Sequence, residues 1–409
     1  FGFFFGYMVV AHVLLPLYYR LNLTSIYGYL GTRIGTHAYR TGSFFFLLSR
    51  MLGTAAKLYL VCLILHTYVF QEMHIPFWLI AVGSVALVWI YTHKSGIKTI
   101  VWTDTLQTFC LIAALIFIIY FTVQKLGLDF SGIIRTIQGS EHSRIFVFDD
   151  WISRQNFFKQ FFSGIFIVIV MTGLDQDMMQ KNLSCRNLRE AKKNMYCYGF
   201  SFIPLNFLFL CLGILLLALA GQMQLELPAM NDDILPMFAT QGYLGHSVLI
   251  LFTIGIIAAA FSNSDSALTA MPTSVCIDLL NTEKDTEEVA RRKRKRVHLL
   301  LSVLLAFFIC LVEMLNNKSV IDAIYIIASY TYGPLLGMFA FGLFTRRQTN
   351  DRLVPLIAIA SPVLCYALDW WISKETGYKF GYELLMLNGS LTFAGIMLLS
   401  GKEKAVKTP

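Results

Sequence analysis

Apolar stretches of about twenty residues recur along the whole chain, separated by shorter polar stretches. A run of about 20 apolar residues is the length that an α-helix needs to cross the hydrocarbon core of a bilayer. The pattern predicts eleven membrane helices, with the two longest connections at 124–156 and 221–245. The helices are expected at residues 3–19, 43–70, 76–92, 97–123, 157–180, 195–220, 246–280, 297–315, 319–344, 352–371 and 383–400. The chain is therefore predicted to be an all-α polytopic membrane protein.

The composition supports this class. The chain has 409 residues, of which 56% are hydrophobic and only 14% are charged, whereas a soluble protein is about 25% charged. The formal net charge of +8 is interpreted as a sign of membrane topology and not of nucleic-acid binding. The eight cysteines are scattered without a CxxC pair, and none falls in a connection that we place outside. Neither a disulfide nor a metal cage is therefore expected.

Basic residues alternate from one connection to the next. Most of the 33 Lys and Arg residues fall in every second connection, which predicts that residue 1 lies outside and that the C-terminus is cytoplasmic. The densest run, RRKRKR at Arg291–Arg296, is interpreted as a cytoplasmic stop, with a protein or lipid partner as the alternative. The chain opens FGFFFGYMVVAH without an initiator methionine, so we expect it to begin inside or just before a helix.

One apolar stretch, Gly255–Leu280, carries a cluster of polar residues in its middle. On a helix, Ala259, Ser262, Asn263 and Ser266 form one stripe, and Asp265 and Thr269 extend the polar surface beside it. A carboxylate at bilayer depth costs at least about 2.5 kcal/mol, so it normally faces a cavity, an ion or a partner. Hydroxyl and carboxyl oxygens suit a small hard cation. The alternative is helix–helix packing, which Ser, Thr and Ala also favour.

Other charges fall within the predicted membrane helices. Asp104 lies near the start of the fourth helix, where it is either hydrated at the interface or part of a site. Lys57 lies in the middle of the second helix, too deep to extend easily to the surface, so it is expected to pair with an internal acid or a bound anion. Asp175 and Asp177 lie at the inner end of the fifth helix, where an exposed gate or capping role is expected.

Several stretches of the chain together resemble the sodium/solute symporter family. They are SGIKTIVWTDTLQTF, LDQDMMQKNLSCRNLREAKKN, SNSDSALTAMPTSVCIDLL, YGPLLGMFAFGLF and NLTSIYGYLGTRIG, in the family's order and over nearly the whole chain. The resemblance implies a five-plus-five inverted-repeat fold of the leucine-transporter type with extra C-terminal helices. It divides one transmembrane domain, 1–409, into the rest of the first repeat (1–123), the second repeat (157–345) and two extra helices (352–400). The first core helix, which supplies backbone carbonyls to the sodium site, would be absent from this chain.

The resemblance also implies where ions bind. The ligands of the family's sodium site fall on the carbonyl of Ala259 and on Ser262 and Asn263. Family members usually have Ser or Thr where this chain has Asn263, but an amide oxygen can still coordinate a hard cation. The ligands of the family's second cation site fall on Asp104, Asp265 and Ser266.

The substrate is expected to be an organic anion and not a hexose. The sugar-transporting branch of the family has Glu in a PEYL stretch where this chain has Tyr27–Leu30, and its aromatic gate aligns with Met171. The loss of a hydroxyl-reading acid and of a stacking ring argues against a sugar. Lys57 falls on the third core helix, where some acid-transporting members place a basic residue. Asp175 and Gln176 match the family's inner-gate segment.

The resemblance therefore implies a sodium-coupled secondary active symporter that imports a small organic solute by alternating access around a midplane site. Such a protein is not an enzyme, its coupling ion is sodium, and its expected place is the bacterial inner membrane. Two alternatives remain open from the sequence. One is a transporter-like sensor or scaffold that binds a ligand and signals through a partner. The other is a symporter that couples to protons through Asp104 or Asp265.

Overall fold

The computed structural model describes residues 1–409 except 22, 24, 93–96, 316–319 and 402–409. The described residues form helices and connecting loops, with one isolated β-bridge between Thr349 and Ser400. The helices of the first half are α1 (Gly2–Val9), η1 (Val10–Leu14), α2 (Leu15–Leu21), α3 (Gly28–Arg33), α4 (Thr36–Ile64), η2 (Leu65–Val69), η3 (Gln71–Met73), α5 (Phe77–Thr92), α6 (Ile97–Leu126), α7 (Phe130–Gly139), η4 (Glu141–Ser143), α8 (Phe157–Val168), η5 (Ile169–Gly173), α9 (Gln176–Leu183) and α10 (Leu188–Gln222). Those of the second half are η6 (Asn231–Asp233), α11 (Ile234–Thr240), α12 (His246–Ser274), η7 (Val275–Leu279), η8 (Thr282–Lys284), α13 (Glu287–Leu315), α14 (Val320–Phe344), η9 (Asp351–Leu353), α15 (Val354–Thr376) and α16 (Leu384–Leu398).

Within the described part of the chain, eight helical stretches are long and apolar enough to cross a membrane. A ninth span is possible if Phe157–Gly173 and Gln176–Leu183, which are bent by 66° at a short break, count as one, and two shorter apolar helices cover Phe77–Ile90 and Leu384–Leu398. Each of the eleven predicted helices overlaps one of these elements.

Three helices begin at least seven residues earlier than the hydrophobic pattern predicts, and the first is α4, which begins at Thr36 instead of residue 43. Helix α10 begins at Leu188 instead of residue 195, and α13 begins at Glu287 instead of residue 297. Both extensions are charged turns on the side predicted to be cytoplasmic, where a helix needs no apolar face. The start of α10 is fixed by a cap, because the Asn187 side chain accepts a hydrogen bond from the Glu190 amide. Hydrophobic runs therefore mark the membrane part of each helix and not its ends.

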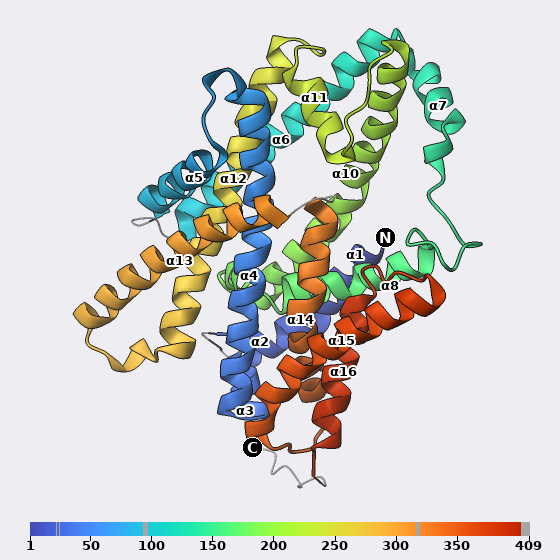
Figure 1. Ribbon diagram of the computed structural model, residues 1–409. Coiled ribbons are helices and arrows are strands. Elements are labelled where there is room, and N and C mark those ends of the chain that lie inside the picture. Colours follow the sequence, from blue (N-terminus) through green and yellow to red (C-terminus); the bar gives the residue numbers. More distant parts are fainter. Residues whose placement is uncertain (22, 24, 93–96, 316–319, 402–409) are drawn as a thin grey trace.

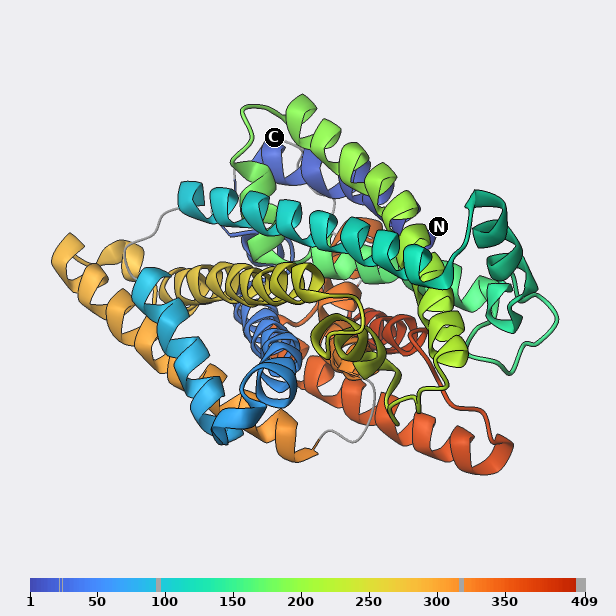
Figure 2. The same ribbon diagram turned by 90° about the horizontal axis from the view of Figure 1, so that it is seen from above.

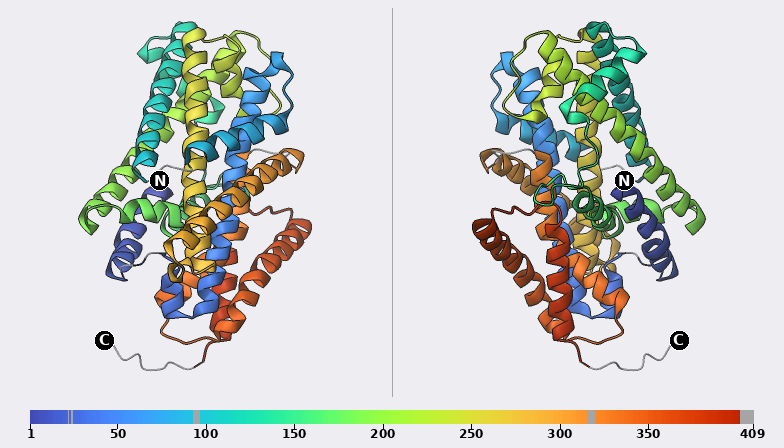
Figure 3. Two further views of the ribbon diagram at one scale, coloured as in Figure 1. Left: turned by 90° about the vertical axis from the view of Figure 1, so that its left-hand side faces the viewer. Right: turned by 90° about the vertical axis from the view of Figure 1, so that its right-hand side faces the viewer.

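Helix α4 stands at the centre of the molecule, with α12 and α14 packed beside it (Figure 1). Helix α6 runs along α12, and the pair is seen side by side from above in Figure 2. Helices α13 and α15 lean outward from this central column (Figure 3). The outer face of α15 exposes large apolar side chains, among them Leu356, Ile359, Val363 and Trp370. Such a continuous apolar surface is what a bilayer covers.

The break between η5 and α9 is held in place from the α2–α4 region. The Tyr18 hydroxyl donates to the Gly173 carbonyl at 2.9 Å, and the Tyr27 hydroxyl donates to the Leu174 carbonyl at 2.9 Å. Both tyrosine side chains are fully buried. Carbonyls that the break frees from helical hydrogen bonds therefore keep partners inside the protein, as backbone at membrane depth requires.

Helix η7 is tied to α4 through Asp278. This carboxylate is fully buried and accepts hydrogen bonds from Tyr39 at 2.6 Å, Ser274 at 2.5 Å, Ser43 at 3.0 Å and Ser25 at 3.2 Å. Hydroxyl donors thus replace the water that a buried carboxylate would otherwise need.

We expect Asp278→Ala to lower the free energy of unfolding by about 3 kcal/mol, because it leaves several buried hydroxyls without an acceptor. Heat-unfolding in detergent micelles would show this as a fall in the apparent melting temperature. The matched variant Ser25→Ala removes only the longest of the four contacts and should cost about 1 kcal/mol or less. A melting temperature that Asp278→Ala leaves unchanged would mean that these hydrogen bonds contribute nothing to the packing of η7 on α4.

Candidate functional site

The first part of the site is the start of α9, immediately after the break. The Asp175 side chain caps this helix, since it accepts hydrogen bonds from the Asp177 amide at 3.0 Å and the Met178 amide at 3.2 Å. The expected capping role is confirmed. The expected exposure is wrong, because Asp175 is 0% and Asp177 is 4% exposed. Two carboxylates so deeply buried need a positive partner.

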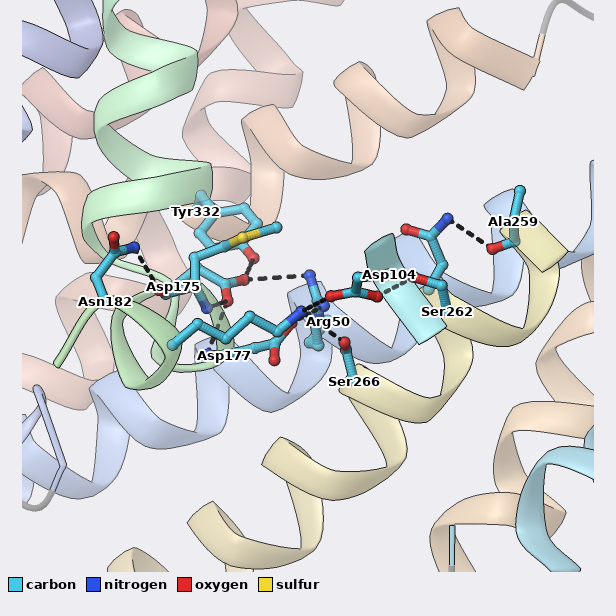
Figure 4. A network of polar contacts seen from close by, with 12 residues as sticks. Arg50, Asp104, Asp175, Asp177, Asn182, Ala259, Ser262, Ser266 and Tyr332 are labelled. Atoms are coloured by element: carbon cyan, nitrogen blue, oxygen red, sulfur yellow. Dashed lines mark hydrogen bonds and ion pairs between the residues drawn. The ribbon is translucent and has the colours of Figure 1, made fainter. Parts of the chain in front are cut away.

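That partner is Arg50 of α4, whose guanidinium lies between the two carboxylates (Figure 4). It forms a close ion pair with Asp177 and lies 3.6 Å from an Asp175 oxygen. The Tyr332 hydroxyl of α14 donates to the same Asp175 oxygen at 2.7 Å. Arg50 was not among the residues predicted from the sequence, although its place inside a predicted membrane helix was a usable signal, because such charges are rare and functional.

Lys57 lies two helical turns after Arg50 on the same face of α4. Both side chains line a small cavity of about 20 Å³, and Met171 lies in its wall. The cavity is lined by Ser49, Arg50, Gly53, Thr54, Lys57, Met171, Ile324, Ile327, Ala328 and Tyr332. Lys57 forms no ion pair with any residue that the structure describes.

The second part of the site is the polar stripe of α12. Asn263 donates its side-chain amide to the Ala259 carbonyl at 3.0 Å, so these two expected ligands are already in contact. Ser262 is 7% exposed, and Ser266 and Asp265 are 2% and 0% exposed. These three side chains therefore face the protein interior, where α12 packs on α4, α6 and α9, while Ala259 and Asn263 are half-buried.

Asp104 of α6 joins this stripe. One of its carboxylate oxygens accepts a hydrogen bond from the Ser262 hydroxyl, and the other lies 3.0 Å from the Lys181 ammonium of α9. Lys181 also donates to the Ser266 hydroxyl at 2.7 Å. Figure 4 shows Asp104, Ser262 and Ser266 drawn together in this way. The structure thus places Asp104 against the α12 stripe and Lys181, while its side chain stays 31% exposed.

Lys181 is the second site residue that was not predicted from the sequence, because it was assigned to a basic cytoplasmic connection. It lies four residues after Asp177 on α9, so the two side chains share one face of that helix. Asp177 binds Arg50 of α4, and Lys181 binds Asp104 of α6 and Ser266 of α12. Helix α9 is therefore connected by charge to the cavity on one side and to the α12 stripe on the other.

Comparison with known proteins gives one family. The model of the "Sodium:solute symporter family" matches residues 1–352. The sodium/sialic acid symporter NanT of Aliivibrio fischeri is 27% identical over 94% of this chain and 76% of its own length. The rabbit (Oryctolagus cuniculus) sodium-dependent multivitamin transporter is 27% identical over 84% of this chain, and the human (Homo sapiens) sodium/iodide cotransporter is 24% identical over 82%. The chain spans only 54% and 53% of the length of these last two relatives.

A solved structure shows the same fold. It is described as the substrate-bound outward-open state of a Na+-coupled sialic acid symporter, and it superposes with a TM-score of 0.78 over 97% of this chain and 83% of that one. The two sequences are 19% identical, so this likeness concerns the fold. The prediction of an all-helical polytopic membrane protein with an inverted-repeat core and extra C-terminal helices is confirmed. These proteins are transporters and not enzymes.

Proposed function

The chain belongs to the sodium:solute symporter family, and we propose that it is a sodium-coupled symporter that carries a small organic anion by alternating access. Sodium coupling and a small organic solute are what the family and its relatives support. The finer proposal rests on the polar stripe of α12, in which Ser262, Asp265 and Ser266 are buried, taken together with Lys57. Lys57 lines a cavity and forms no ion pair with any residue that the structure describes.

For sodium we propose the Ala259 carbonyl, the Ser262 hydroxyl and the Asn263 amide oxygen as ligands. Sodium is a hard cation that takes oxygen ligands, and all three groups are oxygen donors on one face of α12. In the continuous helix α12 the Ala259 carbonyl accepts the helical hydrogen bond and also the Asn263 side-chain amide, so sodium binding requires the Asn263 amide to turn away and present its oxygen instead. We propose a second cation site at Asp104, Asp265 and Ser266, where two carboxylates can balance positive charge.

For the solute we propose that Lys57 binds its negative group and that Met171 shapes the cavity wall. When Lys57 is protonated, the charges of Arg50, Lys57, Asp175 and Asp177 cancel, so an anion entering together with one sodium ion leaves the centre of the protein electrically balanced. Sialic acid and the monocarboxylates, which the relatives carry by name, are organic anions. This balance favours an anion over a neutral hexose.

For the inner gate we propose Asp175 and Gln176. The Gln176 side-chain carbonyl accepts a hydrogen bond from the Ile26 amide at 2.9 Å, and Tyr332 holds Asp175. A shift of the start of α9 away from Ile26 and Tyr332 would break both contacts. Sodium and solute would then be coupled because each stabilises the same arrangement of α9, and such coupling is reciprocal.

The chain is a multi-pass membrane protein, and we propose the bacterial inner membrane with a cytoplasmic C-terminus as its place. We propose one transmembrane domain over 1–409, with 1–123 and 157–345 belonging to the two repeats and 352–400 forming the two extra helices. The exposed basic run Arg291–Arg296 is proposed to be a positive-inside stop, with a protein partner as the alternative.

Transport in proteoliposomes tests the proposal. The protein is given an inward sodium gradient and radiolabelled sialic acid, a short monocarboxylate or, as the neutral comparison, glucose. We expect one of the two anions to accumulate only when sodium is present. A sensor would bind label without exchanging it in a counterflow assay. A proton-coupled carrier would accumulate label without sodium and follow the pH gradient.

Lys57→Met should lower the uptake of that anion about 10- to 100-fold at low concentration, because a charge-assisted hydrogen bond contributes about 1.5–3 kcal/mol. The half-saturating anion concentration should rise, while the sodium dependence should keep its shape. The control is Lys193→Met, which removes an exposed lysine on α10 and should leave uptake unchanged. Equal anion affinity in both variants would show that the anion binds elsewhere than at Lys57.

A further inference from the structure

The second cation cluster of the α12 stripe already contains a positive charge that belongs to the protein. We propose that the Lys181 ammonium is the resident cation of the Asp104, Asp265 and Ser266 cluster, so that the protein binds one sodium ion and not two. This inference rests on the proposed function, because it concerns the second of the two proposed cation sites. It assigns Lys181 the role of setting ion stoichiometry.

The contacts of Lys181 are those that a bound cation would make. Its Nζ atom lies 3.0 Å from an Asp104 carboxylate oxygen and 2.7 Å from the Ser266 hydroxyl oxygen. The other Asp104 oxygen is taken by the Ser262 hydroxyl. Ammonium and sodium carry the same charge and bind the same kinds of oxygen atom, so Lys181 occupies two of the three residues proposed to bind a second cation, Asp104 and Ser266.

Sodium cannot simply bind next to Lys181. Two unit positive charges a few ångströms apart repel strongly inside a protein, where the effective dielectric constant is well below that of water. Asp265 and Ser266 are 0% and 2% exposed, so little water reaches the inner side of the cluster to screen such a pair. A second sodium ion would have to displace the ammonium from Asp104 before it could enter.

The ammonium is also held where it is. Lys181 shares one face of α9 with Asp177, whose carboxylate pairs with the buried Arg50 of α4, and Asp175 caps the same short helix. The backbone that carries Lys181 is thus fixed at the preceding turn. A charge positioned in this way loses little entropy by staying in the cluster, unlike an exposed ion pair between two free side chains.

The alternative is that Lys181 and Asp104 form an ordinary ion pair at a partly hydrated edge, since their side chains are 27% and 31% exposed. In that case sodium would not use this cluster whether or not Lys181 were present. The two interpretations differ in what happens when the ammonium is removed and the oxygen atoms are kept.

Equilibrium binding of ²²Na⁺ to the purified protein in lipid nanodiscs distinguishes them. We expect the unaltered protein to bind one sodium ion per chain and Lys181→Met to bind two, with the sodium dependence changing from hyperbolic to two-site. Lys181→Arg keeps the charge and should stay at one ion. Adding Asp104→Asn to Lys181→Met should return the count to one. If Lys181→Met fails to fold, Lys181→Gln, which keeps a polar side chain, takes its place in the same comparison.

Each other outcome is also decisive. Two sodium ions on the unaltered protein would overturn the role of Lys181 and leave sodium-coupled symport intact. One ion on both the unaltered protein and the Lys181→Met variant would show that the cluster is no sodium site, which overturns the inference as well. No saturable sodium binding to the unaltered protein would instead overturn the proposed function on which the inference rests.

Discussion

A protein carrying Asp104→Asn together with Ser262→Ala is expected to lose sodium-driven uptake almost completely, by about 100-fold or more in initial rate. Ser262 is a proposed sodium ligand, and its hydroxyl also donates to the Asp104 carboxylate, so it belongs to both cation clusters. The double change removes a sodium ligand, and it removes the charge that balances Lys181 beside the stripe. The measurement is the initial rate of anion uptake into proteoliposomes under an inward sodium gradient.

Ser264→Ala is the matched control for this prediction. Ser264 lies on the same helix two residues further on, is fully buried, and its hydroxyl oxygen has no hydrogen-bond partner among the described residues. Its removal changes the helix by one small polar atom without touching the proposed ligands, so uptake should stay within about twofold. If the double variant kept a tenth or more of the sodium-driven rate, the sodium site would have to lie elsewhere than on this face of α12.

How much of this site the sequence could predict depends on the distance between its parts along the chain. The α12 stripe was predictable, because its oxygens repeat at helical spacing within one segment and only their burial remained to be seen. Asp104 is 158 residues before Ser262. Helical periodicity shows which face of a helix is polar, but it does not show which other helix lies against that face. Only the family resemblance placed Asp104 beside this helix, in a cation site with Asp265 and Ser266.

Lys181 and Arg50 were not predicted as site residues from the sequence, and the reasons differ. Lys181 follows the break of the fifth segment, and the 66° bend turns α9 back so that a lysine predicted to lie in a loop meets α6 and α12. The hydrophobic pattern contains no measure of such an angle. Arg50 lies inside a predicted membrane helix, where its charge was itself a signal, but its two partners are more than a hundred residues away. Buried ion pairs between distant helices are determined by packing, and a hydropathy profile does not encode packing.

The second large effect is expected for Arg50→Met, which should abolish both the folded protein and its transport. The variant leaves the Asp175 and Asp177 carboxylates buried without their guanidinium. Breaking a buried ion pair by removing one partner costs about 3–5 kcal/mol, a large share of the stability of an ordinary protein. Size-exclusion chromatography in detergent and the apparent melting temperature measure the loss. A variant that eluted and melted like the unaltered protein would show that the two aspartates are solvated and that this cluster does not hold α9.

Neutralising the whole cluster separates stability from function. The triple variant Arg50→Met, Asp175→Asn and Asp177→Asn removes all three charges and keeps nearly the same shapes, and such replacement of a buried ion pair is often neutral or stabilising. We expect it to recover most of the lost melting temperature, since the amide oxygen that Asp175→Asn introduces can still cap α9 and accept from Tyr332.

Sodium-driven transport should not return in the triple variant. The net negative charge that Arg50, Asp175 and Asp177 together carry would be gone, so Lys57 would attract the anion without an opposing charge and would release it slowly. A triple variant that both folded and transported normally would therefore show that the aspartates serve packing alone and have no part in the exchange of solute.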